Sequence, residues 1–131
     1  MSQLQPTIQI EELRTVGVPV TDQDRASSFY VNTLGFHKRL DVPIGDGKRW
    51  IVVAPPRGTA TIALVASDEH LPIWVETGIR LISHDVENAH AALVAGGVDA
   101  DQVLRWERVP PMFSFRDQDG NGLKIVERAR V

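Results

Sequence analysis

The chain contains no cysteine, which excludes disulfide bonds, thiol nucleophiles and cysteine-ligated zinc. No apolar run reaches the length needed to span a membrane, and residues 1–12 lack the basic start and apolar stretch of a signal peptide. The net charge of −3 provides no basic excess of the kind that indicates a nucleic-acid partner. A length of 131 residues is typical of one domain. These properties predict a single-domain cytoplasmic protein with no membrane or nucleic-acid partner.

The most informative stretch is residues 113–128, which has the pattern of a β-hairpin. Apolar and polar residues alternate on both sides of residues 117–122, a cluster of turn formers in which Gly120 and Gly122 can adopt positive φ. The face predicted to pack under a helix consists of Phe113, Phe115, Leu123 and Ile125. The opposite face of the hairpin is then available for function.

The same turn has a second interpretation, as the start of a calcium-binding EF-hand loop. Asp117, Asp119 and Asn121 occupy the first, third and fifth positions of such a loop. Gly122 follows at the sixth position, but the twelfth position, which requires a bidentate glutamate, is Arg128. The flanking residues also alternate like strands rather than helices. A plain hairpin turn is therefore favoured over the calcium loop.

The rest of the chain predicts two copies of a β-α-β-β-β unit. In the first unit Thr21 or Asp22 caps a helix that ends at Gly35, and the expected strands are residues 13–20, 36–41, 50–54 and 60–66. In the second unit Asp85 caps a helix that ends at Gly96, and the expected strands are residues 78–83, 103–106 and the two arms of the hairpin.

The two units match at a shift of 63 residues, which aligns the helix caps Asp22 and Asp85. The shift also aligns Val16 with Ile79, Val18 with Leu81, Ala26 with Ala89 and Tyr30 with Leu93. With one or two residues removed further along, it aligns Trp50 with Met112, Val52 with Ser114 and Ala63 with Lys124. The repeat predicts an N-terminal extension, residues 1–12, and one domain, residues 13–131, built from modules 13–66 and 78–128.

Four stretches together resemble the vicinal oxygen chelate superfamily: residues 16–30, Leu34-Gly-Phe36, Gly45-Asp-Gly47 followed by Trp50, and residues 115–121. That superfamily includes glyoxalase I, bleomycin-type drug-binding proteins, fosfomycin-resistance enzymes and extradiol dioxygenases. The resemblance covers nearly the whole chain from about Leu13 onward and rests on the order and spacing of the motifs. It implies an α+β fold in which two modules form an open, cup-shaped, eight-stranded mixed sheet with the helices outside. Such proteins are usually homodimers.

The resemblance also specifies where a metal would bind, because metal-binding members supply ligands from the first and last strands of each module. The matching positions are Thr15, Ala63, Gly78 and Lys124. Two of them have no donor atom, and the lysine ammonium would repel a divalent cation. The four histidines, which are His37, His70, His84 and His90, do not share a strand face. We therefore expect no metal and no other cofactor, and His84 remains the histidine best placed near the rim of the cup.

Alternation along the strands predicts which residues line the cup and bind a ligand. The predicted binding residues are Thr15, Trp50, Val52, Ala63, Arg80, Met112, Ser114 and Lys124. An apolar concave surface with a few fixed polar groups is typical of a small-molecule site. Trp50 is expected to stack on a flat ligand, while Arg80 and Lys124 meet its carboxylate, phenolate or phosphate. In the alternative interpretation the indole fills space and the two cations point outward.

Two classes of function fit this pattern. The first is a metal-free protein that binds a small aromatic or anionic compound, as the bleomycin-type members do. The second is a glyoxalase- or dioxygenase-like lyase, isomerase or transferase, either metal-free or with an atypical metal site. Alternation places no Asp or Glu in the cup, so the only candidate base is a desolvated Lys124. Binding is therefore favoured, in a homodimer for which Trp74 in the linker is a candidate interface residue.

Overall fold

The computed structural model describes residues 7–129, so residues 1–6 of the predicted N-terminal extension and residues 130–131 lie outside the described part. Within the described range the fold is α+β, with two mixed sheets. The N-terminal sheet has the order β1-β4-β3-β2 and consists of β1 (Thr15–Val20), β2 (His37–Gly45), β3 (Lys48–Ala54) and β4 (Thr61–Ala66). The C-terminal sheet has the order β5-β7-β6 and consists of β5 (Glu76–Ser83), β6 (Met112–Arg116) and β7 (Gly122–Glu127).

Each half of the chain contributes one helical segment that begins after an aspartate cap, which is Asp22 rather than Thr21 in the first half and the predicted Asp85 in the second. The Asp22 carboxylate accepts the amides of Asp24 and Arg25 at 3.0 and 3.1 Å and begins α1 (Gln23–Ser28). This helix continues as a π-helical turn, η1 (Phe29–Thr33), rather than as the single α-helix expected. The Asp85 carboxylate accepts the amide of Asn88 at 3.0 Å and begins α2 (Val86–Ala95). Within residues 7–129, no helix has the length and apolar character needed to cross a membrane.

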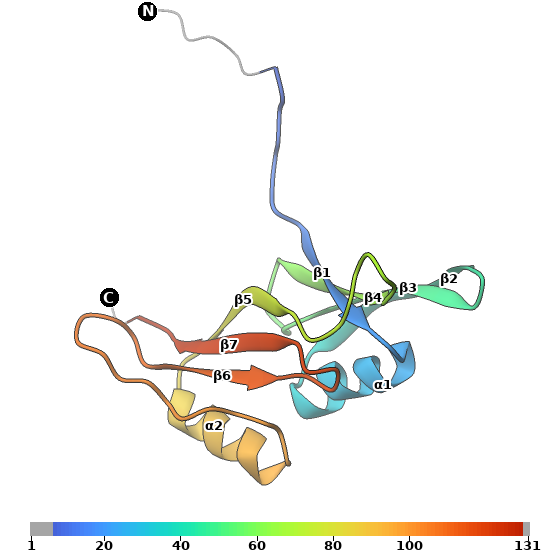
Figure 1. Cartoon of the computed structure of the whole chain (residues 1–131). Helices are drawn as coiled ribbons and strands as arrows, with labels where there is room; N and C mark the ends of the chain where they lie inside the picture. Colours follow the sequence, from blue (N-terminus) through green and yellow to red (C-terminus); the bar gives the residue numbers. More distant parts are fainter. Residues whose placement is uncertain (1–6, 130–131) are drawn as a thin grey trace, which may run out of the picture.

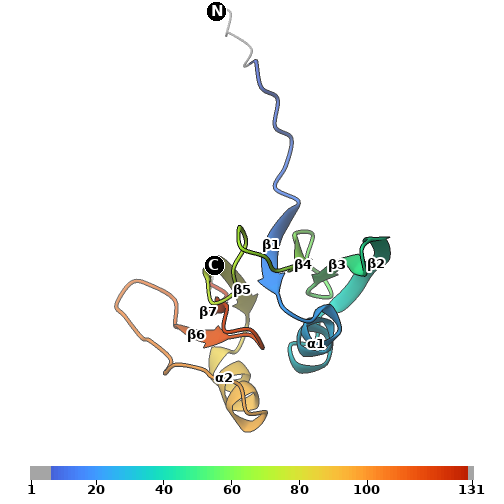
Figure 2. The same cartoon turned by 45° about the vertical axis from the view of Figure 1, so that its right-hand side comes forward.

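The helices cover one face of each sheet. Helix α1 packs on β3 and β4, and α2 packs on β6 and β7. Figures 1 and 2 show both helices on the same side of the molecule, below the two sheets. Gln23 fixes α1 to the sheet, because its amide nitrogen donates to the carbonyls of Arg49 and Leu64 at 2.6 and 2.9 Å. The face of each sheet opposite its helix is called the open face below.

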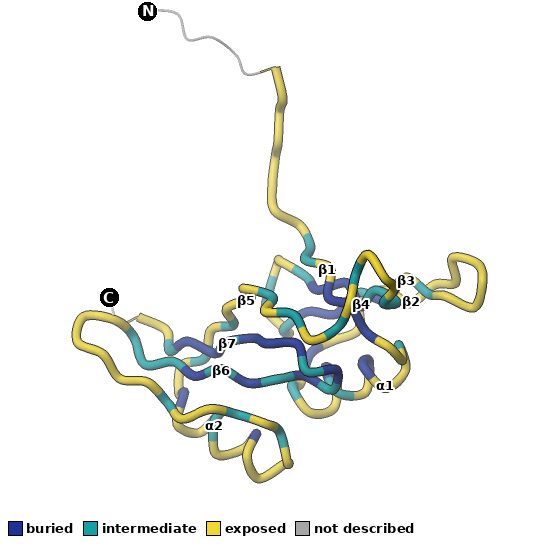
Figure 3. The backbone as a smooth tube through the Cα atoms, viewed as in Figure 1, coloured by how far each residue is buried: buried dark blue, intermediate teal, exposed yellow. Residues whose placement is uncertain are grey.

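The core lies between the helices and the sheets, where the tube of Figure 3 is coloured as buried. The hairpin face predicted to pack under a helix is confirmed, because the exposed fractions of Phe113, Phe115, Leu123 and Ile125 are 0%, 0%, 1% and 8%. Tyr30 and Leu93, which the repeat aligns, both belong to the same buried cluster. Alternation in the sequence therefore assigned the buried face of the hairpin correctly.

The predicted single eight-stranded sheet is wrong, since the described residues form a four-stranded and a three-stranded sheet. The missing strand is the one expected at residues 103–106. A longer segment, residues 100–106, does run beside β6, but it makes only isolated bridges, from Ala100 to Phe115 and from Leu104 to Met112. Between the two bridges the outer segment contains one residue more than β6 does. An extra residue of this kind leaves part of the ladder unpaired, so a regular strand does not form.

The turn of the hairpin is buried and holds the two halves of the chain together. The Asp117 carboxylate accepts the Tyr30 hydroxyl at 2.7 Å and the amides of Asp119 and Asn121 at 2.9 and 3.0 Å. Burial, and then the Asp117 charge, raise the pKa of Tyr30 above its ordinary range. The segments beside the turn are strands, so the hairpin interpretation is confirmed and the EF-hand alternative is wrong.

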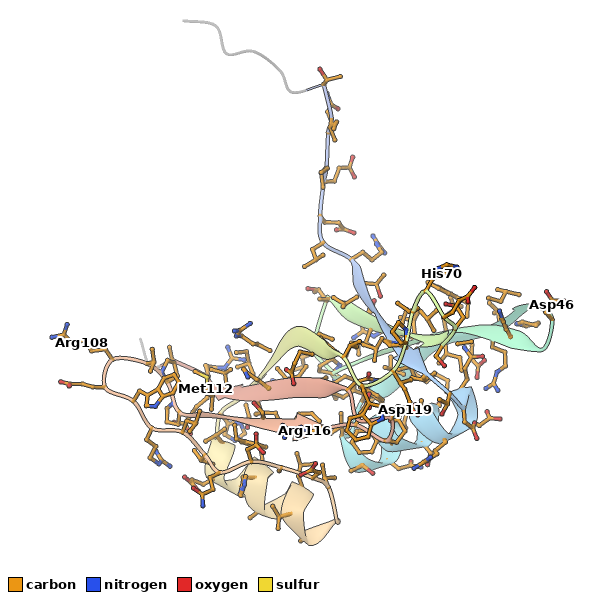
Figure 4. The ribbon with its side chains drawn as sticks, in the orientation of Figure 1. Asp46, His70, Arg108, Met112, Arg116 and Asp119 are labelled. Carbon is orange, nitrogen blue, oxygen red and sulfur yellow. The ribbon has the colours of Figure 1, made fainter. Side chains whose placement is uncertain are left out.

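The other two polar residues of this turn contact β1 and the linker. Asp119 accepts the Thr21 amide at 3.1 Å and the Thr21 hydroxyl at 2.7 Å. The Asn121 side chain donates to the Pro19 carbonyl at 2.8 Å and accepts the Val75 amide at 3.2 Å. Figure 4 shows Asp119 at the end of the hairpin nearest α1. Residues 117–121, called the latch below, therefore join the C-terminal sheet to the first strand of the chain.

Candidate ligand-binding surface

Strand pairing determines which residues share an open face, because directly paired residues point to the same side of a sheet. In the N-terminal sheet, Gly17 pairs with Ala63 and Ala63 with Val52. In the C-terminal sheet, Arg80 pairs with Lys124 and Lys124 with Ser114. These two rows are equivalent under the sequence repeat. All eight predicted binding residues accordingly lie on open faces, four on each sheet.

The open face of the N-terminal sheet is apolar. Val52 and Ala63 are paired, and Trp50 lies two residues from Val52 on β3 with 37% of its surface exposed. Leu40 and Val42 on β2 pair with Val52 and Trp50 and extend the surface toward the sheet edge. Thr15 is half-buried on β1, and its hydroxyl donates to the Thr61 carbonyl at 3.3 Å. This face can contact an apolar or aromatic group, with the indole as its largest exposed ring.

The open face of the C-terminal sheet carries charge. Arg80, Lys124 and Ser114 form one row across β5, β7 and β6, and the Lys124 ammonium donates to the Ser114 hydroxyl at 2.9 Å. The next row consists of Ile82, Val126 and Met112 and is apolar. Met112 therefore lies beside the cationic row rather than in it. The four predicted residues of this sheet occupy two neighbouring rows.

A carboxylate lies on this face as well, which the sequence prediction missed. Glu76 pairs with Gly122 at the start of β5, and a side chain at position 122 would collide with the Glu76 carboxylate. The prediction began this strand at Gly78 and so left Glu76 in the linker. Gly78 has a φ of 74° and lies in an irregular part of the pairing between Glu76 and Arg80. The alternation of Glu76, Gly78 and Arg80 was the signal that could have placed the carboxylate.

Arg116 completes the row that contains Glu76 and Gly122. Its guanidinium donates to the Asp101 carboxylate at 2.9 Å, and this hydrogen bond is the main cause of the raised pKa of Arg116. The charge of Glu76 raises the same pKa further, although its contribution is smaller. Arg116 is therefore compensated by carboxylates of the chain itself.

The positions at which the superfamily binds metal do not form a suitable ligand set here. Ala63 and Gly78 have no side-chain donor, and the Gly78 position is an irregular turn of β5 with positive φ. The Thr15 hydroxyl donates to a carbonyl, and the Lys124 ammonium would lie where a cation should bind. Among residues 7–129, no cluster of three or more histidines and carboxylates could hold a metal. The residues present do not fit the metal.

Two cavities of the described chain lie away from the predicted binding residues. One, of about 530 Å³, is lined by His84, Asp85, Glu127, Arg128 and Ala129. The other, of about 310 Å³, lies between the ends of the two helical segments, next to Gly97 and Gln118. His84 thus lines a cavity, but not one that contains the predicted site.

Trp74 in the linker is held in an unusual position. It has a φ of 68°, and its indole lies against Gly120 of the latch so closely that a side chain at position 120 would collide with it. The ring is nevertheless 76% exposed. Gly120 therefore permits the close approach, and the linker leaves a large aromatic side chain open to solvent.

Comparisons with known proteins agree with this geometry. The profile of the Glyoxalase/Bleomycin resistance protein/Dioxygenase superfamily matches residues 12–125. TnmS3, an antibiotic binding protein from Streptomyces sp. CB03234, is 31% identical with a TM-score of 0.82, over 93% of this chain and 99% of that chain. A member of the same superfamily from Sphaerobacter thermophilus DSM 20745 is 31% identical with a TM-score of 0.84, over 91% and 98% of the two chains. The uncharacterized protein YurT of Bacillus subtilis (strain 168) is 31% identical over 83% of this chain and 93% of its own length.

Proposed function

Because the chain belongs to the Glyoxalase/Bleomycin resistance protein/Dioxygenase superfamily, we propose that it binds a small aromatic or anionic molecule without a metal. The observation that carries the proposal is the composition of the open faces. One presents an exposed indole among aliphatic side chains, and the other presents Arg80 and Lys124. The similarity to an antibiotic binding protein supports binding as the function. Two of the four residues at the positions where the superfamily binds metal have no side-chain donor atom, and a third is a lysine, which supports binding of the ligand without a metal.

Native mass spectrometry and elemental analysis test this proposal on the whole chain, purified without chelators and without a nickel-loaded tag. We expect a co-purified small compound and divalent metal well below one ion per chain. Trp50→Ala should release the compound or weaken its binding, because the indole offers the largest exposed aromatic surface of the N-terminal open face. One divalent ion per chain, with function lost on chelation, would contradict the proposal.

We also propose that two copies of the chain associate. Strands β1 and β5 each pair with a neighbour on one side only, and proteins generally cover such edges. Large apolar side chains are exposed as well, including Trp74 at 76% and, in the extension, Ile8 at 72% and Ile10 at 84%. A second copy would convert the open faces into an enclosed site. Sedimentation should show a dimer at micromolar concentrations, and a monomer would contradict this part of the proposal.

The second candidate function is that of a lyase, isomerase or transferase, and the position of Glu76 favours it. A general base must lie within reach of the bound molecule, and this carboxylate lies on the open face next to the cationic row. If the protein is an enzyme, Glu76→Gln should abolish turnover of the co-purified compound while preserving its binding. If the wild-type protein binds the compound but does not turn it over, the enzymatic function is contradicted and the binding function stands.

A further inference from the structure

Arg80 and Lys124 form a pair of like charges on the open face of the C-terminal sheet. They lie directly opposite each other on neighbouring strands, an arrangement that is unfavourable when both residues are charged. Within residues 7–129, neither of them takes part in an ion pair. Arg116 on the same face does pair, with Asp101 at 2.9 Å. No carboxylate of the described residues therefore pairs directly with either cation of the Arg80–Lys124 row, although Glu76 lies in the neighbouring row.

We propose that Arg80, Lys124 and Ser114 bind an oxyanion, which makes the ligand an organic anion with an apolar body. This inference rests on the proposed binding function and specifies its ligand class. The Lys124 ammonium uses one of its three donors on Ser114, and the Arg80 guanidinium makes one long hydrogen bond, of 3.3 Å, to the Gly78 carbonyl. Several N–H donors remain available. A carboxylate, sulfonate or phosphate oxygen between the two cations would accept them and remove the repulsion.

The rows on either side define how such a ligand lies. On one side are Ile82, which is 55% exposed, and the half-buried Met112, and these can contact an apolar body, whereas Val126 between them is buried. On the other side is the Glu76 carboxylate, which repels a second anionic group. Figure 4 shows Met112 and Arg116 at opposite ends of β6, which marks the two sides. The surface therefore favours a ligand with one anionic end, oriented with its apolar part toward Met112.

Two fluorescent dyes that differ by a single group provide the test. 1-Anilinonaphthalene-8-sulfonate carries a sulfonate, and N-phenyl-1-naphthylamine is the same ring system without it. We expect the wild-type protein to bind the sulfonate about 10-fold more tightly than the neutral dye, by fluorescence titration at low ionic strength. Raising the salt concentration should reduce this ratio, because the added affinity is electrostatic.

Four variants identify the groups responsible. Arg80→Gln and Lys124→Gln should each weaken sulfonate binding by about 10-fold and leave the neutral dye unchanged. The matched control is Arg25→Gln, which removes the same charge from an exposed position on α1 and should change neither affinity. Glu76→Gln should act in the opposite direction and strengthen sulfonate binding, by about 2- to 5-fold. Far-UV circular dichroism confirms that each variant is folded.

The outcomes separate this inference from the function on which it rests. Equal wild-type affinity for the two dyes, or equal effects of Arg80→Gln and Arg25→Gln, would overturn the oxyanion site and leave a binding protein for neutral aromatic compounds. Binding of neither dye, together with the absence of a co-purified compound, would overturn both proposals. A sulfonate preference that both cation variants remove would support the oxyanion site.

Discussion

In the N-terminal sheet the row through Ala63 carries small and aliphatic side chains, whereas the equivalent row of the C-terminal sheet carries Arg80, Lys124 and Ser114. The backbone register is the same, since the first and last strands of each unit pair in parallel at these positions. The turn before the last strand of each half also has the same backbone hydrogen bond but a different environment. The Gly58 amide donates to Pro55 and the Gly120 amide to Asp117, both at 3.0 Å, but only the second turn is buried. One backbone plan thus accommodates an apolar half and a charged half.

This difference shows which parts of the repeat are constrained by folding. Both halves retain an aspartate helix cap, a buried residue at the positions of Tyr30 and Leu93, and the parallel pairing of the outer strands. The residues on the open faces lie outside the main buried cluster, so the two halves can carry different side chains there on the same fold. Four substitutions test this contrast between the two halves.

Asp117→Ala should have the largest effect, because it removes the acceptor for the Tyr30 hydroxyl and for two amides of the latch. Leaving several buried donors without a partner should lower the free energy of unfolding by about 3 kcal/mol or more, measured by urea denaturation. Arg57→Ala in the exposed turn of the N-terminal half is the control and should change it by less than about 0.5 kcal/mol. Similar losses of stability for the two substitutions would show that the buried latch contributes no more to folding than the exposed turn of the N-terminal half does.

Ala63→Lys places the charge of Lys124 at the equivalent position of the N-terminal sheet. Ala63 is only 1% exposed, so the new ammonium must be desolvated or must displace its neighbours, at a cost of about 2–3 kcal/mol of stability. Ala63→Met has a similar length without the charge and separates crowding from desolvation. Full stability of the lysine variant in thermal unfolding would show that the apolar half tolerates charge as well as the other half does.

Tyr30→Phe should cost about 1–2 kcal/mol at neutral pH, because the buried Asp117 carboxylate loses a donor. It should also change the response to alkali. Folding raises the pKa of this hydroxyl from its ordinary value of 10.0, so its contribution to stability is fully present below pH 10 and is lost as the pH rises through the folded pKa. Urea titrations from pH 8 to 11 should therefore show a steeper loss for the wild type, and parallel curves would contradict this assignment.

Lys124→Met should have the smallest effect on folding, and its free energy of unfolding should stay within about 0.5 kcal/mol of the wild type. The substitution removes one of two repelling charges and keeps the length of the side chain. In contrast with Ala63→Lys, it tests whether the charge on the C-terminal open face is dispensable for the fold. A large loss of stability would show that Lys124 supports the structure.

The sequence predicted the local features well because they depend on short-range patterns. Alternation assigned Phe113 and Phe115 to the core and Lys124 to the open face. The sequence placed the second helix cap at Asp85 and narrowed the first to Thr21 or Asp22, of which Asp22 is the cap. The family resemblance then provided the α+β topology. The placement of Trp50 and Arg80 on open faces required only strand parity, although their role in binding remains a prediction.

The features that escaped prediction depend on contacts between distant residues or on irregular backbone. The partners of Asp117 and Asn121 include Tyr30 and Pro19, and no local pattern links residues 87 and 102 positions apart. Glu76 was missed because a glycine with positive φ interrupts its strand, and the segment at residues 103–106 because one extra residue breaks its ladder. Alternation of Glu76, Gly78 and Arg80 could have placed the carboxylate, whereas the broken ladder of the outer segment depends on its pairing with β6 and is not visible in one segment.

The latch has a consequence for how the chain is made. Pro19 lies in the first strand and Thr21 directly follows it. Their hydrogen-bond partners, the side chains of Asn121 and Asp119, lie about a hundred residues later in the chain. During synthesis on the ribosome the N-terminal half must therefore wait, with these polar groups solvated, until the hairpin turn has emerged. Only then can the Tyr30 hydroxyl and the end of β1 reach their final partners. Long-range closure of this kind slows the last step of folding and couples the two halves into one cooperative unit.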